Sequence, residues 1–400
     1  MRVLGVGVAT LDIVSRVDRY PAEDSEVRAL ARRERRGGNA ANTLAALAAL
    51  GHEAHWAGTV ADDPEARRLL AFAARERIDT TARITHRGGR TPVSHIVSSQ
   101  ATGSRTIVHW RDLPELGAED FARIPLEGID WVHFEGRHVP ALAAMLARVR
   151  DFGTRCSLEL EKPRAGIEAL LPLPDVVLCS QQYALARGHP SASDLLEALP
   201  RRPGQALCCA WGSEGAWAIG EDGRRHHSPV FPPPVLVDTV GAGDAFNAGF
   251  IDGWLRGYTA GGALRHACVV AGAKCGIEGF DRLAACLPAE VAPCRLDELA
   301  DPGARGVQAR LPGEGETACL VVRVGKRVHA YRNRCPHTGA PLEWRPHQFL
   351  DGSGKWIQCA LHGALFARDT GRCLQGPCAG DALSPVPVAL RDGWIHLPRA

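Results

Sequence analysis

Apolar and polar positions alternate in blocks over the larger, N-terminal part of the chain. Short apolar runs with the length of buried strands stand at residues 3–12, 129–134, 156–160, 176–179 and 207–210. Amphipathic stretches of helical length separate them, for example 141–150 and 191–199. Strands that alternate with helices in this way predict a parallel sheet joined by crossover helices. We therefore expect an α/β domain in this part of the chain.

The pattern changes near residue 281. Pro and Ala become frequent between residues 283 and 293, which is typical of a linker. Beyond them come short strands, such as 320–324 and 328–331, separated by turns. We expect a domain at 1–285, a linker at 286–292 and a small all-β domain at 293–400.

Composition narrows the class of protein. The chain has 400 residues, 45% hydrophobic and 23% charged, as in soluble globular proteins with more than one core. A net charge of +2 gives no reason to expect nucleic acid or an anionic membrane as a partner, and no apolar run is long enough to cross a bilayer. Asp12 and Asp18 follow the apolar start closely, so we expect a strand there and not a signal peptide. The cysteines, 13 in number and scattered, fit a reducing cytoplasm better than a disulfide framework.

The segment 238–247, DTVGAGDAFN, carries the strongest chemical signal. Gly241 and Gly243 allow the backbone to approach another group closely, and an apolar helical run begins directly after them. Free amides at a helix start bind anions, above all phosphate. Asp244 would then lie beside the anion, where it suits a proton acceptor for an attacking hydroxyl. A glycine turn with a capping Asp before an ordinary helix is the alternative that these residues leave open.

Polar side chains that suit a sugar occur near the start of the chain. Asp12 ends the apolar run 3–12, where open α/β sheets bind ligands, although an Asp there can also simply start a turn. Asn39 and Asn42 open an Ala/Leu-rich helical run three positions apart, so they share one face. An amide both donates and accepts hydrogen bonds, as a set of sugar hydroxyls requires. An N-cap role would explain one of the two but not the other.

Taken together, DTVGAGD at 238–244 and GGNAANT at 37–43 resemble the signature pair of the PfkB/ribokinase-like sugar kinases. WVHFEGR, ELEKPR, CAWGSEGAWAIG and AGAKCGIEGFD further resemble the ketohexokinases within that family, and the resemblance extends to about residue 283. It implies a ribokinase-like three-layer α/β/α domain with a small β lid formed from 13–36, 92–99 and 106–110. The implied activity is ATP-dependent phosphorylation of a ketohexose, D-fructose at O1 first, with Mg²⁺ and optionally K⁺ as cations.

The resemblance also assigns roles to single residues. Asp244 is the implied catalytic base, and Asp24 is expected to reach the sugar site of a second subunit, which implies a homodimer clasped through the lids. The anion-hole amides are those of Gly241, Ala242 and Gly243. The nucleotide contacts fall on Arg105, Gly212, Ser213, Glu214 and Gly215. The sugar contacts fall on Asp12, Asp24, Gly38, Asn39, Asn42 and Asp244.

The protein contacts of Mg²⁺ remain open at this stage. Many ribokinase-like kinases carry Asn-x-x-Glu after a central strand, whereas this chain has Ser180-Gln181-Gln182-Tyr183 there. Ketohexokinases also lack that motif. Glu159 and Glu161 match acids that lie near the metal in the family.

Two Cys-plus-His pairs mark the C-terminal part as a metal-binding domain. Cys335 and His337 form one pair, Cys359 and His362 the other, and each stands beside Gly or Pro in a turn. The set resembles the Rieske ferredoxins, whose 2Fe-2S cluster has two Cys on one iron and two His on the other. A tetrahedral zinc site would take the same ligands and is the rival. The respiratory type adds a disulfide between the two loops, but Ala340 and Leu361 stand at those positions, as in soluble low-potential ferredoxins.

The sequence thus predicts a cytoplasmic ketohexose kinase fused to an electron-carrying Rieske domain, with ATP, a ketose and an unidentified redox protein as partners. Two alternatives remain. The first is a kinase of the same family for another sugar or a nucleoside. The second is an electron-transfer protein whose kinase-like part only senses a sugar.

Overall fold

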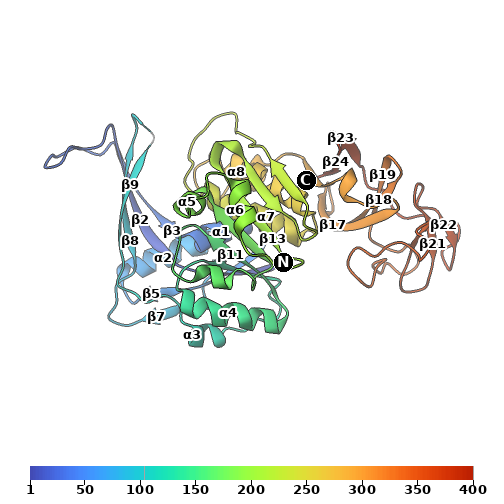
Figure 1. Cartoon of the computed structure of the whole chain (residues 1–400), viewed down its shortest axis with the longest axis horizontal. Coiled ribbons are helices and arrows are strands. Elements are labelled where there is room, and N and C mark those ends of the chain that lie inside the picture. The colour runs from blue at the N-terminus through green and yellow to red at the C-terminus, as the bar shows by residue number, and fades with distance from the viewer. Residues whose placement is uncertain (103, 400) are drawn as a thin grey trace. The chain divides into compact units, whose positions relative to one another are not determined.

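The computed structural model describes residues 1–102 and 104–399, which form two compact units (Figure 1). The first unit comprises Met1–Arg224, Val230–Ala248 and Val270–Cys286. The second comprises Arg225–Pro229, Gly249–Val269 and Leu287–Ala400. Helix α7 (Ala242–Leu255) therefore begins in the first unit and ends in the second, and helix α8 (Ala260–Cys275) returns in the opposite sense. None of the helices in the described residues is long and apolar enough to cross a membrane.

A nine-stranded sheet in the order β15-β14-β13-β12-β11-β10-β1-β4-β6 organises the N-terminal part of the chain. The pairs from β6 to β13 are parallel, and β14 runs antiparallel to β13. Parallel strands are buried on both faces, which explains why they occur as continuous apolar runs. The strands are β1 (Arg2–Val6), β4 (Glu53–Ala57), β6 (Ile78–Asp79), β10 (Trp131–Glu135), β11 (Arg155–Leu160), β12 (Val176–Ser180), β13 (Ala206–Ala210), β14 (Ala216–Ile219) and β15 (Arg225–Ser228).

Helices cover both faces of this sheet, so the expected three-layer α/β/α arrangement is present. Val132 and Phe134 of β10 share one hydrophobic core with the helices α3 to α6. On the other face, Gly5 of β1 lies so close to Leu44 of α1 that an added Cβ would stand 2.7 Å from that side chain. Successive strand residues point to opposite faces, which places α1 across the sheet from α3 to α6. The helices are α1 (Asn39–Ala49), α2 (Pro64–Arg75), α3 (Ala118–Ala122), α4 (Val139–Phe152), α5 (Gln181–Ala186) and α6 (Ala192–Ala198).

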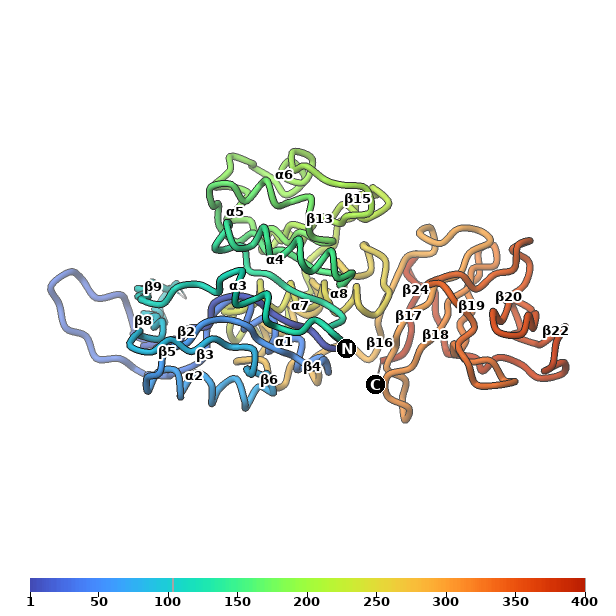
Figure 2. Tube along the Cα trace, turned by 90° about the horizontal axis from the view of Figure 1, so that it is seen from below, coloured from blue at the N-terminus to red at the C-terminus, as the bar shows by residue number. Residues whose placement is uncertain are grey.

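The lid is a four-stranded sheet in the order β3-β2-β8-β9 (Figure 2). Its strands are β2 (Thr10–Val17), β3 (Ala31–Gly37), β8 (Val93–Ser99) and β9 (Arg105–Trp110). The connection from β2 to β3 extends away from this sheet (Figure 2). A separate parallel pair joins β5 (Thr59–Ala61) to β7 (Ile84–His86).

The expectation of one strand over residues 3–12 is wrong. Strand β1 ends at Val6, and the chain enters the lid sheet as β2 at Thr10. Gly7 lies between them, packed against Glu135 and Ala40 so closely that an added Cβ would overlap both. Asp12 therefore belongs to the lid and not to the carboxyl end of a buried strand. An apolar run can predict burial, but it cannot show where the chain changes sheets.

The C-terminal part is a small all-β domain, as expected. It has three antiparallel sheets, in the orders β16-β24-β23, β17-β18-β19 and β20-β21-β22. The last two contribute to a core that includes Leu320, Leu342, Phe349 and Phe366. The expected linker at 286–292 overlaps the first residues of β16. The strands are β16 (Glu290–Arg295), β17 (Gly303–Leu311), β18 (Gly315–Val324), β19 (Arg327–Arg332), β20 (Trp356–Gln358), β21 (Leu365–Ala367), β22 (Cys373–Gln375), β23 (Ala389–Arg391) and β24 (Trp394–Pro398).

Candidate active site and metal centre

The Gly-Ala-Gly turn leads directly into α7, as the anion-site interpretation requires. Gly241 has a φ of 81°, a conformation that favours glycine, and an added Cβ would stand 2.9 Å from the ring of Phe280. The helix begins at Ala242, so the amides of Gly243 and Asp244 lie in its first turn, where backbone N–H groups lack partners within the helix. The helix dipole adds positive potential at this end. Asp244 lies in the same turn and is buried.

A chain of side chains orients the Asp244 carboxylate. The amide nitrogen of Asn42 donates to Oδ2 of Asp244 at 2.8 Å, and Nη1 of Arg36 donates to the amide oxygen of Asn42 at 3.1 Å. A guanidinium group can only donate hydrogen bonds, so Arg36 fixes which end of the Asn42 amide faces Asp244. Arg36 is itself held by Glu76, with 2.6 Å between Nε and Oε2. In this structure Asn42 is thus engaged at both ends of its amide.

Two further buried carboxyl groups accompany Asp244. Glu159, at the end of β11, accepts hydrogen bonds on Oε1 from Asn39 at 3.2 Å and from Asn247 at 3.0 Å. Its other oxygen, Oε2, is buried and has no hydrogen-bond partner among the described residues. Glu135, at the end of β10, accepts from the backbone amide of Val8 at 2.9 Å. Both strand ends lie at the carboxyl edge of the parallel sheet, where such sheets bind ligands.

Burial of these acids changes their proton affinity. Loss of solvent raises the pKa of Asp244 to about 7, since a charged carboxylate is poorly stabilised without water. Burial also raises the pKa of Glu159 well above its usual range, and the neighbouring charges of Asp244 and Glu135 add to this effect. The hydrogen bond from Asn42 and the charge of Arg36 act on Asp244 in the opposite direction. Asp244 can therefore gain and lose a proton near neutral pH.

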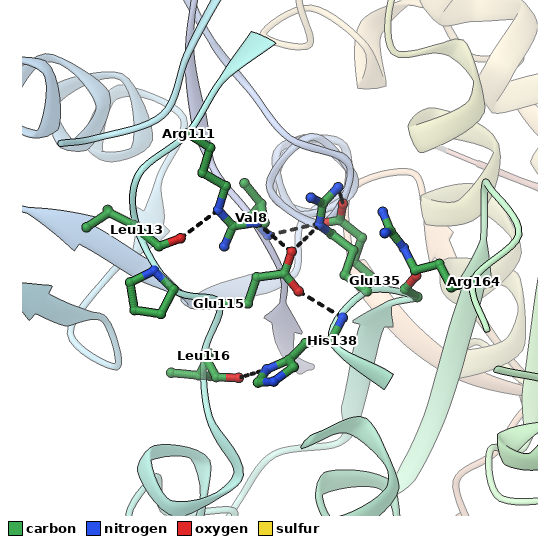
Figure 3. A network of polar contacts seen from close by, with 12 residues as sticks. Val8, Arg111, Leu113, Glu115, Leu116, Glu135, His138 and Arg164 are labelled. Atoms are coloured by element: carbon green, nitrogen blue, oxygen red, sulfur yellow. Dashed lines mark hydrogen bonds and ion pairs between the residues drawn. The ribbon is translucent and has the colours of Figure 1, made fainter. Parts of the chain in front are cut away.

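A network around Glu115 holds the turn that follows Glu135 (Figure 3). Oε1 of Glu115 accepts from Arg111 at 2.5 Å and from Arg137 at 2.8 Å, and Oε2 accepts from the amide of His138 at 2.8 Å. Arg137 also approaches Glu135, with 3.6 Å between Nη1 and Oε1. The network thereby fixes the side chains beside the buried acids.

The glycine pair before α1 makes room for its neighbours. An added Cβ on Gly37 would overlap the carboxylate of Asp12, and one on Gly38 would overlap the carbonyl oxygen of Val8. Gly38 has a φ of 103° and stands at the N-cap of α1. Asp12 accepts a hydrogen bond from Thr10 at 2.7 Å. The structure thus brings the start of α1, with Asn39 and Asn42, close to the lid strand that carries Asp12.

The remaining sugar and nucleotide positions lie on other elements. Gly212, Ser213 and Glu214 form a short 3-10 helix after β13, at the same carboxyl edge of the sheet, and Gly215 follows it. Arg105 begins the exposed lid strand β9, and Asp24 lies exposed in the connection between β2 and β3. The roles assigned to Arg105 and Asp24 stay predictions.

Sequence reasoning missed the group that holds the anion turn. Lys274, near the end of α8, is fully buried and donates to both the carbonyl oxygen and the carboxylate of Asp238, each at 2.9 Å. The carbonyl of Cys275 accepts from the amides of Val237 and Asp238, and Asp238 accepts from the amide of Val240 at 2.9 Å. A lone Lys in an apolar Ala/Gly/Val helix was the signal available in the sequence, because a buried ammonium group needs partners.

In the C-terminal domain the two Cys–His loops have the same backbone geometry. The amide of Cys335 donates to the carbonyl of Ala340 at 2.8 Å, and that of Cys359 donates to Ala364 at 2.9 Å. Gly339 and Gly363 each return a 2.8 Å bond to the Cys carbonyl, with φ values of 77° and 68°. Both cysteines are buried, whereas His337 and His362 are exposed. Two matching loops thus present two sulfurs inward and two imidazoles outward.

The four side chains divide into a nitrogen pair and a sulfur pair. The Nδ1 atoms of His337 and His362 are 3.3 Å apart, about the separation of two nitrogens bound at roughly 2.0–2.1 Å to one tetrahedral ion. The thiol groups of Cys335 and Cys359 contact each other. Among the described residues, no three Cys, His, Asp or Glu side chains converge on a single ion site. A cluster with two irons requires one nitrogen pair and one sulfur pair, one on each iron.

Comparison with known proteins matches the two parts of the chain to two families. Residues 2–282 match the pfkB family of carbohydrate kinases, and residues 293–388 match the Rieske [2Fe-2S] domain. Ketohexokinase of Mus musculus is 39% identical over 291 residues, which span 70% of this chain and 98% of that protein. An ATP-dependent ribose-1-phosphate kinase of Halopiger xanaduensis is 29% identical over 70% of this chain and 93% of its own length.

Solved structures give the same fold for the N-terminal part. Adenosine kinase of Sinorhizobium meliloti superposes with a TM-score of 0.60 at 22% identity and covers 71% of this chain and 98% of its own. A ribokinase of Arabidopsis thaliana gives 0.58 at 19% identity, over 72% of this chain and 95% of its own. The ribokinase-like fold is therefore the fold of this region.

We expect the Arg36→Met substitution to move the acid limb of the pH–rate profile. A base acts only when it is deprotonated, so kcat should rise with pH through the pKa of Asp244 and level off above it. Removing the Arg36 charge removes a contribution that lowers this pKa, so the limb should shift to higher pH. The profile is measured from pH 5 to 9 and compared with Arg36→Lys, which keeps the charge. Arg32→Met, an exposed change on the same strand, is the control, and coinciding profiles would contradict the orientation role.

We expect Cys335→Ser or Cys359→Ser to abolish the visible absorption of a 2Fe-2S cluster, since each change removes a thiolate ligand. His337→Cys, where a cluster still assembles, should lower its reduction potential because histidine ligands raise it. Iron and sulfide analysis of anaerobically purified protein is the measurement, and Cys319→Ser, a buried cysteine outside the two loops, is the control. Stoichiometric zinc without iron would contradict the assignment.

Proposed function

Because the chain belongs to the pfkB family of carbohydrate kinases and carries a Rieske [2Fe-2S] domain, we propose that it transfers the γ-phosphoryl group of ATP to a ketohexose, D-fructose at O1 being the preferred acceptor. The observation that carries the proposal is Asp244, a buried carboxyl with a pKa of about 7 in the first turn behind a glycine anion turn. The 39% identity to a ketohexokinase over nearly its whole length supports the choice of sugar.

In the proposed reaction Asp244 accepts the proton of the attacking hydroxyl. Asn42 holds Oδ2 of Asp244 by donation, so Oδ1 is the oxygen left to take the proton. The amides of Gly241, Ala242 and Gly243 are the proposed donors to the negative charge that gathers on the transferred group, although the Ala242 amide donates to the carbonyl of Thr239 at 3.2 Å in this structure. Preorganised donors of this kind supply much of the rate enhancement in phosphoryl transfer. Asp12, Asn39 and Gly38 line the side from which the sugar approaches.

A divalent cation on the nucleotide phosphates neutralises their charge in such reactions. The unpartnered Oε2 of Glu159 is the protein atom that fits a hydrated cation, because a buried carboxylate oxygen otherwise lacks compensation. A site with one or two carboxylates, water and phosphate is the usual arrangement for Mg²⁺. The residues present therefore fit a Mg²⁺ ion whose other ligands are water and the nucleotide phosphates. The ammonium group of Lys274 is a fixed positive charge bound to Asp238 at the start of the anion turn. A charge in that place reduces the need for a K⁺ ion there.

The C-terminal domain is proposed as an electron carrier. A 2Fe-2S cluster held by the Cys and His pairs exchanges one electron. The histidine end is exposed, and Leu361 and Trp344 are exposed beside it, with the Trp344 indole donating to the carbonyl of Ala360 at 2.7 Å. An apolar rim around the exposed end of a redox centre suits a transient protein partner. We place the protein in the cytoplasm because no disulfide joins any of the cysteines in the described residues.

A homodimer through the lid is proposed on the exposure of β9. Ile107, Val108 and Trp110 are each more than half exposed, although they form a regular strand of the lid sheet. An apolar strand surface of this kind marks a protein contact. The neighbouring Asp24 connection would then reach the partner's sugar site.

A second candidate function is a kinase for another sugar or a nucleoside. The relative named a ribose-1-phosphate kinase favours it, since 29% identity over most of its length permits the same scaffold with a different acceptor. A protein that only senses a sugar and carries electrons is the third possibility, and the intact base and anion turn count against it.

We expect Asp244→Asn to lower kcat by on the order of 10² to 10⁴ while ATP and fructose still bind, because general-base catalysis contributes about that much. Initial rates by coupled assay and binding by calorimetry are the measurements. Asp222→Asn, an exposed change in a surface turn, is the control. Turnover within a few fold of the wild type would remove Asp244 from the role of base.

We expect D-fructose to have the highest kcat/KM in a panel of ketoses, aldoses, pentoses and nucleosides. The reason for the preference is that four residues match positions of ketohexokinases: Asp12, Asp24, Asn39 and Asn42. The panel is run at saturating ATP, with ATP hydrolysis in the absence of sugar as the blank. Ribose or adenosine as the best acceptor would reject fructose and keep the kinase, whereas no acceptor above the blank would favour the sensing role.

A further inference from the structure

The boundary between the two compact units does not coincide with the boundary between the two families. The match to the kinase family extends to residue 282, but Gly249–Val269 belongs to the same compact unit as Leu287–Ala400. This segment is the end of α7, the turn at 256–259 and the start of α8. The second unit therefore combines the α7–α8 segment of the kinase, Gly249–Val269, with the Rieske domain.

Ion pairs and hydrogen bonds within that unit join the turn to the C-terminal domain. Arg256, in the turn, binds Asp252 of α7 at 2.7 Å and Glu316 of β18 at 2.6 Å. Asp252 is 1% exposed and the Arg256 side chain 12%, so the pair lies inside the unit and not on a wet surface. The amide of Gln308 also donates to the carbonyl of Arg256 at 2.8 Å. Arg305 donates to the carbonyl of Gly257 at 2.6 Å.

Backbones also meet directly. An added Cβ on Gly262, at the start of α8, would overlap the carbonyl oxygen of Pro293, and one on Gly257 would lie 2.7 Å from the carbonyl oxygen of Gly306. Thr259 donates from its amide to Pro293 at 3.0 Å and from its hydroxyl to Glu298 at 2.8 Å. At these glycines the α7–α8 segment and the Rieske strands pack too closely for a layer of water to lie between them.

We propose that the Rieske domain is a fixed brace for the α7–α8 turn, so that the kinase and the Rieske domain unfold together and occupancy of the kinase site stabilises both. The two helices supply the connection. Helix α7 begins at Ala242, two residues before Asp244. Lys274, which holds the anion turn, lies next to the last residue of α8. Any group that binds the folded kinase then stabilises the Rieske domain by the same mass action. The use of ATP and sugar as probes rests on the proposed function.

The test is amide hydrogen exchange of the full-length, cluster-loaded protein, followed in β1 (Arg2–Val6) of the kinase and in β17 (Gly303–Leu311) of the Rieske domain. The probes are a non-hydrolysable ATP analogue with Mg²⁺ and fructose. With either ligand added alone at about 100 times its dissociation constant, exchange of the slowest amides should slow by roughly 100-fold in both strands. Slowing in β1 with an unchanged β17 would overturn the proposal.

A variant pair tests the brace without any ligand. Glu316→Gln removes the ion pair to Arg256 of the α7–α8 turn and a longer pair, 3.5 Å, with Arg310 of the Rieske domain. Glu314→Gln removes only a pair with Arg332 that stays within the Rieske domain, so it controls for the loss of such a pair. Glu316→Gln should speed exchange of the slowest amides by about two- to fivefold in β1 and β17 alike, since Glu316 is partly exposed. Acceleration confined to β17 would overturn the proposal, as would equal acceleration of β1 by the two variants. If the ligands slow neither strand but this pair behaves as expected, the proposed ligands are wrong and the brace stands.

Discussion

The burial of the Asp244 carboxyl group is the constraint on which the active site depends. A carboxylate at the start of α7 with little solvent holds its proton more tightly than usual, and its pKa of about 7 suits a base that must be free at neutral pH and still accept a proton. The same burial makes the site sensitive to each neighbour. Asn42 and Arg36 favour the charged form, while Glu159 and Glu135 disfavour it or compete for the proton.

The fold meets this constraint by bringing distant segments to one edge of the sheet. Asn42 and Asp244 lie 202 residues apart in sequence and Asn39 and Glu159 lie 120 apart, yet each pair shares a hydrogen bond. Parallel strands end at the same edge, so the last residues of β10 and β11 meet the starts of α1 and α7 there. Lys274 completes the arrangement from the far end of α8, because its ammonium group anchors the backbone that leads into the anion turn.

Much of this was predictable from local pattern, and the exceptions share a cause. The alternation of strands and helices, the glycine turn before α7 and the paired Cys–His loops are encoded over a few residues each, and all are present. The chain's exit from β1 at Val6, the pairing of Arg36 with Asn42 and the burial of Lys274 depend on segments far away in sequence. Periodicity cannot reveal such contacts. The domain boundary behaves in the same way, since Gly257 and Gly262 look like ordinary helix and turn residues until Gly306 and Pro293 are placed against them.

The central claim is that Asp244 is a buried base with a pKa near neutrality. It is tested most directly by the carboxyl ¹³C resonance of Asp244 in protein labelled at aspartate, assigned by its loss in Asp244→Asn and titrated from pH 4 to 9 without ligands. The account predicts a titration with a midpoint of about 7. A midpoint near 3.8, the ordinary value for an aspartate, would contradict it.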